Sequence, residues 1–430
     1  MSCLGAPLRA RRRQIHETSP AASRSSTPAP IVVLTRLRFL PAVATVALLA
    51  ATTLTAQPSV PRRPGNLALT PPMGWNSWNR FGCNVSDRLI RETADAIAAN
   101  GMRDAGYQYV TIDDCWQVAR SATGTIVVDS VRFPAGMKAL ADYVHGKGLK
   151  FGIYTDAGRK TCEGRPGSYG YEAIDARTYA AWGVDYVKVD WCNSEGLDAP
   201  TQYRIVRDAF AAAGRPMVLS ICEWGLNRPW EWAPGVGNLW RTTGDIQDRW
   251  SSILTLVDLN VQYSHVAGPG GWNDPDMLEV GNGGMTPNEY RAHFSLWAMM
   301  AAPLNAGNDV RAMMDSTDAA TLVREILLNK DVIAVDQDSL GRQATIVQAS
   351  PSETQVWSKP LADGSRAVLL FNRASVATTI TADWGRVGLG ATRGRVRDLW
   401  AHSDLGVIET RYAATVPSHG VVMLRVWPVK

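Results

Sequence analysis

Between residues 66 and 310 the sequence repeats one unit, a short apolar or β-branched run followed by a stretch with helical periodicity. Eight runs occur, at 73–78, 107–115, 150–156, 186–192, 217–224, 239–245, a weaker one at 263–266 leading into 268–277, and 295–304. The stretch 86–105 is an amphipathic helix candidate with Ser86 as its N-cap. Alternating strands and helices predict a parallel sheet with right-handed crossovers. Eight repeats in about 240 residues favour a (β/α)8 barrel.

An open doubly wound sheet is the main alternative for such an alternation. That fold would place a glycine-rich phosphate loop after the first strand. The sequence has none there, and Gly268–Gly271 lies late and opens no helix. A nucleotide-dependent enzyme is therefore disfavoured together with the open sheet.

After about residue 340 the pattern changes to short runs of alternating polarity. These runs lie at 355–359, 366–372, 377–381, 396–399 and 421–426. Turns such as Ala362-Asp363-Gly364 separate them. The sequence therefore predicts an α/β protein in two domains, a barrel at 66–340 and a small antiparallel β-sandwich at 341–430. We interpret the sandwich as a stabilising appendage rather than a carbohydrate-binding module.

The first 56 residues have the features of a targeting segment. Arg36 and Arg38 precede an apolar run at 39–54, which ends at Ala56 before a proline-rich linker at 57–65. This pattern predicts a secretory signal with cleavage near Ala56, and hence a secreted or periplasmic protein. A membrane anchor is the alternative, but the run of about 16 residues is shorter than the ~20 that span a bilayer. The depth of the run indicates that translation starts downstream, near 31–34.

The charge balance argues against nucleic acid or anionic lipid as a partner. The chain has 44 basic and 40 acidic residues, but residues 1–56 hold seven arginines and one glutamate. The remainder carries 37 basic and 39 acidic residues, a net charge of −2. A folded part this close to neutral has no bulk attraction to phosphate backbones or membranes.

Cysteine and histidine usage predicts no metal site and no cofactor. The six cysteines lie at positions 3, 83, 115, 162, 192 and 222, and removal of the leader leaves five. In an exported protein these predict disulfides with one thiol left over. The sequence contains no CxxC motif and no HxxxH spacing.

Polar side chains follow the ends of the predicted barrel strands, where barrel enzymes place their chemistry. They are Asp113, Asp114, Tyr154, Asp156, Lys188, Asp190, Glu223, Arg241, Asp245, Asp274 and Asp276. Six tryptophans lie among them, at positions 75, 78, 116, 191, 224 and 272. One such aspartate is more often a helix cap or turn residue than a catalytic group. Many of them around one mouth, with flat aromatic surfaces, indicate a ligand with many hydroxyls and no strong charge, which describes a sugar.

Two of these carboxylates suit hydrolysis of an acetal. Lys188 and Asp190 lie two apart on one strand, so their side chains point the same way and the ammonium can hold the carboxylate ionised. Such a carboxylate can act as a nucleophile, and Asp245 beside Arg241 can supply the proton. Residue types alone leave a structural Lys–Asp pair equally open, and do not decide between retention and inversion.

The amino-acid sequences around the predicted strand ends resemble those of a known family. The stretches are Pro72-Met73-Gly74-Trp75-Asn76-Ser77-Trp78, Ile112-Asp113-Asp114-Cys115-Trp116, Gly152-Ile153-Tyr154-Thr155-Asp156, Lys188-Val189-Asp190-Trp191-Cys192, Cys222-Glu223-Trp224 and Gly271-Trp272-Asn273-Asp274-Pro275-Asp276-Met277. In this order they resemble the α-galactosidases of glycoside hydrolase family 27, the melibiases. The resemblance runs from about residue 67 to 341, and more loosely to the C-terminus.

The resemblance implies a barrel with a β-domain that hydrolyses terminal, non-reducing α-galactosyl groups with retention and without a metal. Asp190 would be the nucleophile and Asp245 the acid and then the base. The residues that would hold or line the sugar are Trp78, Asp113, Asp114, Tyr154, Lys188, Arg241 and Asp276. It also suggests disulfides pairing Cys83 with Cys115 and Cys162 with Cys192. Cys222 is then the free thiol, which we interpret as buried and inert.

Specificity within the family is expected to depend on two loops. Asp113 and Asp114 favour a hexose over a pentose such as arabinopyranose. Glu223 and Leu226 disfavour a 2-acetamido sugar, because N-acetylgalactosaminidases carry small residues there. Asn227 replaces an aromatic residue of several relatives. A β-L-arabinopyranosidase, an α-N-acetylgalactosaminidase and an inactive sugar-binding protein remain alternatives, and no oligomeric state is predicted.

Overall fold

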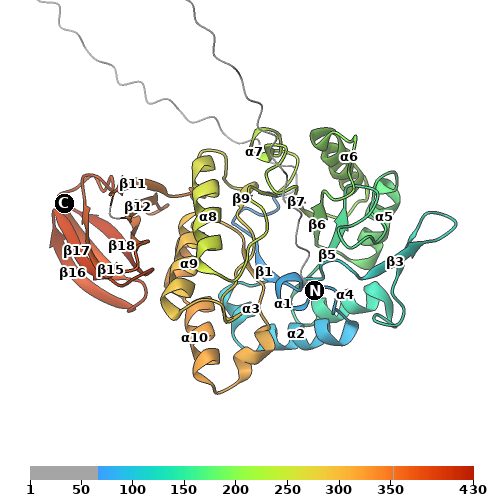
Figure 1. Ribbon diagram of the computed structural model, residues 1–430, viewed down its shortest axis with the longest axis horizontal. Helices are drawn as coiled ribbons and strands as arrows, with labels where there is room; N and C mark the ends of the chain where they lie inside the picture. The colour runs from blue at the N-terminus through green and yellow to red at the C-terminus, as the bar shows by residue number, and fades with distance from the viewer. Residues whose placement is uncertain (1–65, 352) are drawn as a thin grey trace, which may run out of the picture. The chain divides into compact units, whose positions relative to one another are not determined.

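The computed structural model describes residues 66–351 and 353–430, so the predicted leader and linker lie outside the described residues. Eight parallel strands form one sheet in the order β10-β1-β2-β5-β6-β7-β8-β9 (Figure 1). They are β1 (Met73–Asn76), β2 (Tyr109–Thr111), β5 (Lys150–Asp156), β6 (Tyr186–Asp190), β7 (Val218–Cys222), β8 (Leu239–Arg241), β9 (Trp272–Asp274) and β10 (Leu304–Ala306). An isolated parallel bridge from Leu278 to Ala306 completes the ring. The predicted (β/α)8 architecture is confirmed.

Helices alternate with these strands. They are α1 (Trp78–Phe81), α2 (Asp87–Ala99), α3 (Met102–Ala105), α4 (Gly136–Gly146), α5 (Glu172–Trp182), α6 (Ala199–Ala212), α7 (Pro229–Trp232), α8 (Trp250–Asn260), α9 (Pro287–Met299), α10 (Asp318–Leu327) and α11 (Lys330–Asp336), with short 3-10 turns η1 (Val261–Tyr263) and η2 (Val310–Met314). Ser86 caps α2 as predicted, because its side chain accepts a hydrogen bond from Leu89 N. In the described part of the chain, no helix is long and apolar enough to cross a membrane.

One strand prediction near the end of the barrel is wrong, and a second is confirmed only in its later part. The run at 295–304 belongs mostly to α9, and the strand is β10 at its far end. The helix begins with a capping box between Thr286 and Glu289 and has Pro287 in its first turn. Its residues from Ala292 to Met299 are all buried, so this mostly apolar stretch shows no amphipathic pattern and resembles a buried strand. In the weaker segment, 263–266 forms no strand, but the stretch 268–277 that it leads into contains β9 at 272–274.

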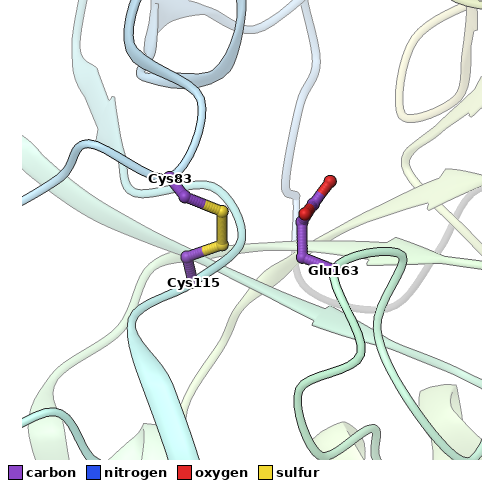
Figure 2. A group of neighbouring side chains, drawn as sticks. All are labelled: Cys83, Cys115 and Glu163. Atoms are coloured by element: carbon purple, nitrogen blue, oxygen red, sulfur yellow. A yellow bond between two sulfur atoms is a disulfide. The ribbon is translucent and has the colours of Figure 1, made fainter. Parts of the chain in front are cut away.

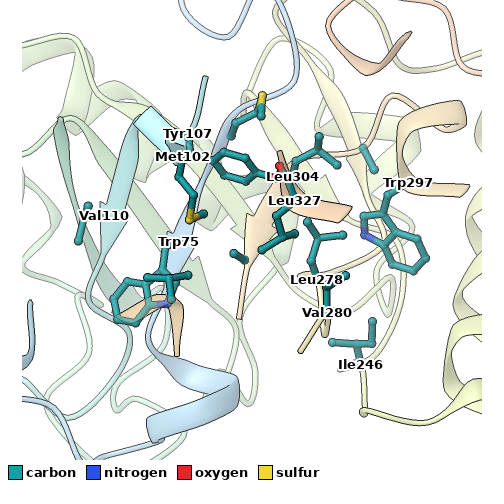
Figure 3. Close-up of a cluster of buried hydrophobic side chains, with 14 of the residues drawn as sticks. Trp75, Met102, Tyr107, Val110, Ile246, Leu278, Val280, Trp297, Leu304 and Leu327 are labelled. Carbon is teal, nitrogen blue, oxygen red and sulfur yellow. Dashed lines mark hydrogen bonds between the residues drawn. The ribbon is translucent and has the colours of Figure 1, made fainter. Parts of the chain in front are cut away.

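The core of the barrel unit consists of large side chains from the strands and the surrounding helices. Figure 3 shows part of this cluster, including Trp75, Met102, Tyr107, Trp297 and Leu327. Their polar atoms are satisfied locally: Trp75 Nε1 donates to Asn308 O (2.8 Å) and Tyr107 Oη to Leu327 O (2.9 Å). The rigid scaffold that results holds the strand ends in fixed positions.

The C-terminal strands are all antiparallel, as the sequence predicted. They are β11 (Thr345–Ala349), β12 (Thr354–Pro360), β13 (Arg366–Asn372), β14 (Thr378–Asp383), β15 (Arg393–Asp398), β16 (Ser403–Glu409), β17 (Arg411–Val416) and β18 (Val421–Val429). Six form a sheet in the order β11-β12-β13-β18-β15-β16, and β14 pairs with β17. Trp357, Phe371 and Met423 on one face join the core that contains α9, and Val368 and Leu370 on the other face pack with β14. A small hairpin of β3 (Gln117–Arg120) and β4 (Ile126–Val128), which the sequence did not predict, follows β2 and projects from the barrel (Figure 1).

Candidate active site

A cavity opens at the carboxyl ends of the barrel strands. Its lining consists of Trp78, Asn79, Asp113, Asp114, Tyr154, Cys162, Lys188, Asp190, Trp224, Arg241, Asp245, Asp276 and Met277. The structure therefore brings together both predicted catalytic aspartates and seven of the nine residues expected to contact the sugar.

Lys188 lies between Asp113 and Asp190 in the lining of the cavity. Its Nζ donates to Asp113 Oδ2 at 2.9 Å and lies 3.7 Å from Asp190 Oδ1. Burial alone would lower the pKa of Lys188, but Asp113 and Asp190 raise it well above its usual value. The lysine therefore stays charged in a buried position.

Asp190 ends strand β6 and is almost fully buried. Its Oδ2 lies 3.5 Å from Cys162 Sγ, and within the described residues its Oδ1 accepts no hydrogen bond. Burial raises the pKa of Asp190 to about 6, although Lys188 lowers it. The expectation that Lys188 keeps this carboxylate ionised is correct in sign, but desolvation is the larger effect.

Asp245 follows β8 and is more open, with 65% of its side chain exposed. Its Oδ1 accepts two hydrogen bonds, from Arg241 Nη2 at 2.9 Å and from Trp224 Nε1 at 3.1 Å. Burial opposes ionisation, but Arg241 and Lys188 hold the pKa of Asp245 below its usual value. The two carboxyls of the proposed pair therefore have pKa values displaced in opposite directions.

Asp276 links Arg241 to the loop that carries Asp245. Its Oδ1 lies 3.0 Å from Arg241 Nη1, and its Oδ2 accepts from Ile246 N at 2.8 Å. Asp276 itself has φ of 90°, in the left-handed region that non-glycine residues rarely adopt. The surrounding contacts hold this conformation, which fixes the position of both charged groups.

Asp113 and Asp114 are held by backbone and side-chain donors at the end of β2. Asn76 Nδ2 donates to Asp113 Oδ2 at 2.7 Å, and the backbone nitrogens of Cys115 and Glu163 donate to the two oxygens of Asp114 at 2.6 and 3.1 Å. Burial raises the pKa of Asp114. Both side chains are thereby rigidly presented to the cavity.

Glu223 and Leu226, which were expected to contact the sugar, do not line the cavity. Trp224 (φ 56°) and Gly225 (φ 78°) turn the backbone sharply after β7. The Glu223 carboxylate then points to Asn227, accepting from its backbone nitrogen at 2.5 Å and from Nδ2 at 2.8 Å. Leu226 is 71% exposed. From this loop it is Trp224 that lines the site.

Sequence reasoning did not assign four lining residues to the site. Asn79 and Met277 directly follow the predicted contacts Trp78 and Asp276, and this adjacency was the available signal. Asn79 Nδ2 donates to the buried Glu279 Oε1 at 2.5 Å, which orients its amide. Cys162 was considered only as a disulfide partner, and Trp224 only as one of several strand-end tryptophans.

Disulfides join Cys83 to Cys115 and Cys162 to Cys192, the two pairs that the resemblance suggested, and Cys222 is free and buried. Two cysteine and carboxylate clusters lie nearby. Glu163 stands beside the first bridge (Figure 2), and Asp156 lies near the second. All four sulfurs are consumed in disulfides, so these clusters offer no thiolate to a metal ion. The bridges fix loops at the mouth of the barrel.

Two family models match the chain. The model described as alpha galactosidase A matches residues 70–338, and that of the alpha galactosidase C-terminal beta sandwich domain matches residues 351–426. The chain belongs to the α-galactosidase family. It is 49% identical to an α-galactosidase of Cyamopsis tetragonoloba, covering 84% of this chain and 87% of the relative. It is also 49% identical to α-galactosidase A of Cellvibrio japonicus, covering 84% and 93%.

Solved structures give the same result. α-Galactosidase I from Mortierella vinacea superposes with a TM-score of 0.81 at 40% identity, covering 85% of this chain and 98% of that one. A β-L-arabinopyranosidase from Geobacillus stearothermophilus gives 0.74 at 26% identity, covering 84% and 97%. The melibiase resemblance of the sequence is confirmed, and the activity of this glycoside hydrolase is that of an α-galactosidase.

Proposed function

We propose that this α-galactosidase is a retaining exo-enzyme in which Asp190 is the nucleophile and Asp245 the acid and base. The observation that carries the proposal is the buried Asp190 Oδ1, which accepts no hydrogen bond from the described residues and lies 3.7 Å from the Lys188 ammonium, in a cavity that Asp245 also lines. A carboxylate oxygen without a hydrogen bond is available to bond to an anomeric carbon.

The reaction takes place in two displacements. Asp190 Oδ1 forms a bond to the anomeric carbon while the bond to the leaving oxygen breaks, and Asp245 gives its proton to that oxygen. Asp245 then removes a proton from water, whose oxygen attacks the same carbon and releases Asp190. Each step inverts the carbon, so the product retains the α configuration.

The pKa values define which protonation state reacts. Burial raises the pKa of Asp190 to about 6, whereas Arg241 and Lys188 hold the pKa of Asp245 below its usual value. Between these values the pair holds one proton, mainly on Asp190. Acid catalysis uses the form with the proton on Asp245, which is in rapid equilibrium with the first.

The remaining charged lining residues recognise hydroxyls. Asp113, Asp114 and Asp276 offer acceptors, and Lys188 and Arg241 offer donors, all on side chains already fixed by internal contacts. Trp78 supplies an apolar face, and Tyr154 contributes to the wall. Preorganised groups of this kind bind sugar without much loss of side-chain entropy.

Terminal α-galactosyl groups of oligosaccharides, polysaccharides or glycoconjugates are the proposed substrates. The higher identity to α-galactosidases than to the arabinopyranosidase supports a hexose. We also propose domain limits at 340/341 and removal of residues 1–56 by a signal peptidase. The two disulfides support export, since such bridges persist in oxidising compartments.

A trapping experiment tests the nucleophile. A fluorinated galactosyl fluoride that forms the glycosyl-enzyme quickly and releases it slowly is incubated with the enzyme, which is then digested and analysed by mass spectrometry. The label is expected on the peptide that contains Asp190. A stable label on another carboxylate would contradict the assignment.

A further inference from the structure

Trp224 is placed at the cavity in a way that the sugar contacts do not explain. Its indole Nε1 donates to Asp245 Oδ1 at 3.1 Å, and Arg241 Nη2 donates to the same oxygen at 2.9 Å. Both donors therefore occupy Oδ1. The other oxygen, Oδ2, has no hydrogen bond to either of them and is the one left to carry a proton.

The backbone at Trp224 adopts an energetically unfavourable conformation. Its φ of 56° lies in the left-handed region, where the β-carbon of an L-residue is crowded. The next residue, Gly225 (φ 78°), has no room for a side chain, because an added Cβ would lie 2.7 Å from Thr242 O. Strained non-glycine residues concentrate at functional sites, where the surroundings hold them. Here the strain aims the indole at Asp245.

We propose that Trp224 is the positioning residue of the acid/base, which holds Oδ1 of Asp245 so that Oδ2 presents the proton to the leaving oxygen. This inference rests on the proposed role of Asp245. A side chain that is 65% exposed has several accessible rotamers, and a second donor from a rigid ring restricts them. Arg241 holds Oδ1 through Nη2 while its Nη1 contacts Asp276, and the Trp224 indole adds a second donor to the same oxygen.

Trp224 can be replaced without altering any of the charges around Asp245. The charged groups that act on Asp245 are Arg241 on β8, Lys188 and Asp190 on β6, and Asp276 after β9, with the Cys222 thiol of β7 nearby. Trp224 is the neutral donor among them. Replacing it with phenylalanine removes one hydrogen bond without changing any charge.

The test compares Trp224→Phe with the matched control Trp232→Phe, in full-length enzyme. Trp232 lies on α7, does not line the cavity, and donates its own indole hydrogen to Asn227 O at 2.8 Å. For each protein, kcat/KM is measured on melibiose, whose leaving group needs a proton, and on a dinitrophenyl α-galactoside, whose leaving group does not.

In Trp224→Phe the ratio of the two kcat/KM values is expected to fall about tenfold, a fraction of what general acid catalysis contributes. The control ratio should stay at the wild-type value. Inactive or misfolded protein cancels from this ratio, because both substrates are measured on the same preparation. Equal losses on both substrates would overturn the proposal, since a residue that only packs the loop would produce them.

A pH profile gives a second, independent readout. The Trp224 hydrogen bond stabilises the ionised form, so its loss raises the pKa of Asp245. In the free enzyme this group titrates at the lower pH, and the acid limb of kcat/KM on melibiose should move up by about half to one pH unit. An unmoved limb would contradict the inference.

The variant Asp245→Asn distinguishes failure of the acid role of Asp245 from failure of the positioning role of Trp224. If it shows no dependence on the leaving group, the proposed acid role fails. If it shows that dependence and Trp224→Phe does not, only the positioning role fails.

Discussion

Two lysines are buried beside aspartates in this protein, one at the barrel mouth and one where the β-sandwich meets the barrel. Lys188 Nζ lies 2.9 Å from Asp113 and 3.7 Å from Asp190, next to the cavity. Lys359 on β12 donates to the backbone oxygen of Ala298 in α9 at 2.9 Å and lies near Asp336 of α11. The residue types are the same, but the environments differ.

The difference appears in the charge that each region supports. At the mouth, two carboxylates raise the pKa of Lys188. At the interface, burial lowers the pKa of Lys359 to about 8 and raises that of Asp336 to about 8, so both groups are displaced toward neutrality. A buried Lys–Asp combination is therefore no sign of catalysis by itself. The surplus carboxylate and the adjoining cavity distinguish the catalytic region from the structural one.

The largest expected effect separates the aspartates of the two regions. Asp190→Asn should reduce kcat on p-nitrophenyl α-galactoside by at least about 10³-fold, because the amide cannot act as a nucleophile. Asp336→Asn should leave kcat within about twofold of wild type, since its side chain is remote from the cavity lining. Circular dichroism would verify that both variants fold. A similar kcat for Asp190→Asn and Asp336→Asn would contradict the assignment of the barrel mouth as the catalytic region and of the interface as a structural one.

Asp245→Asn should give a loss that depends on the substrate. We expect kcat/KM to fall by about 10²–10³-fold on melibiose and far less on a dinitrophenyl galactoside, because only the first leaving group needs a proton. Steady-state kinetics on both substrates measure this. Uniform losses would indicate that Asp245 acts only as a fixed charge beside Arg241.

Replacement of each lysine by methionine tests the comparison directly. Lys188→Met should lower kcat/KM by about 10²-fold, the equivalent of one or two charged hydrogen bonds, and should also lower Tm because Asp113 and Asp190 lose their cation. Lys359→Met should leave kcat/KM nearly unchanged but destabilise the fold by about 1–2 kcal/mol, because the buried Ala298 oxygen loses its hydrogen bond from Nζ. Thermal melts and kinetics on the same preparations provide both readouts. The reverse pattern would mean that the two regions have been assigned the wrong way round.

The smallest expected effect is in the pH profile. The pKa of Asp190 is raised to about 6, and its ionisation removes the single proton of the pair. On melibiose, kcat/KM should therefore fall as pH rises above about 6. On a dinitrophenyl galactoside it should rise through pH 6 and stay high, since only the ionised nucleophile is required. In Lys188→Met, loss of the cation raises the pKa of Asp190, so both transitions should move to higher pH. Profiles that coincide for the two substrates would contradict the acid role.

The sequence predicted the charged residues at the barrel mouth, but it did not predict the Lys359–Asp336 pair at the domain interface. Strand periodicity places Lys188 and Asp190 on one side of β6, and barrel topology brings the other strand ends to the same rim. Periodicity and topology gathered these strand-end residues, and the family resemblance then selected the expected sugar contacts, of which seven line the cavity together with both catalytic candidates. Lys359 and Asp336 lie in different domains, and no local pattern reveals that the chain brings them together.

Two differences between expectation and structure within the barrel have local causes. Glu223 was expected at the sugar, but the left-handed residues Trp224 and Gly225 reverse the chain and turn its carboxylate to Asn227. Strand or helix periodicity contains no information on such a turn. The α9 helix was mistaken for a strand because burial on all sides removes its amphipathic pattern.

The most direct test of the central claim is the stereochemistry of the first sugar released. The exported form, from about residue 57 onward, would be mixed with p-nitrophenyl α-D-galactopyranoside and followed by proton NMR of the anomeric signal. The double displacement through Asp190 and Asp245 predicts α-galactose first, with the β-anomer appearing only as the sugar mutarotates. Initial release of β-galactose would show a single displacement by water and would contradict Asp190 as the nucleophile.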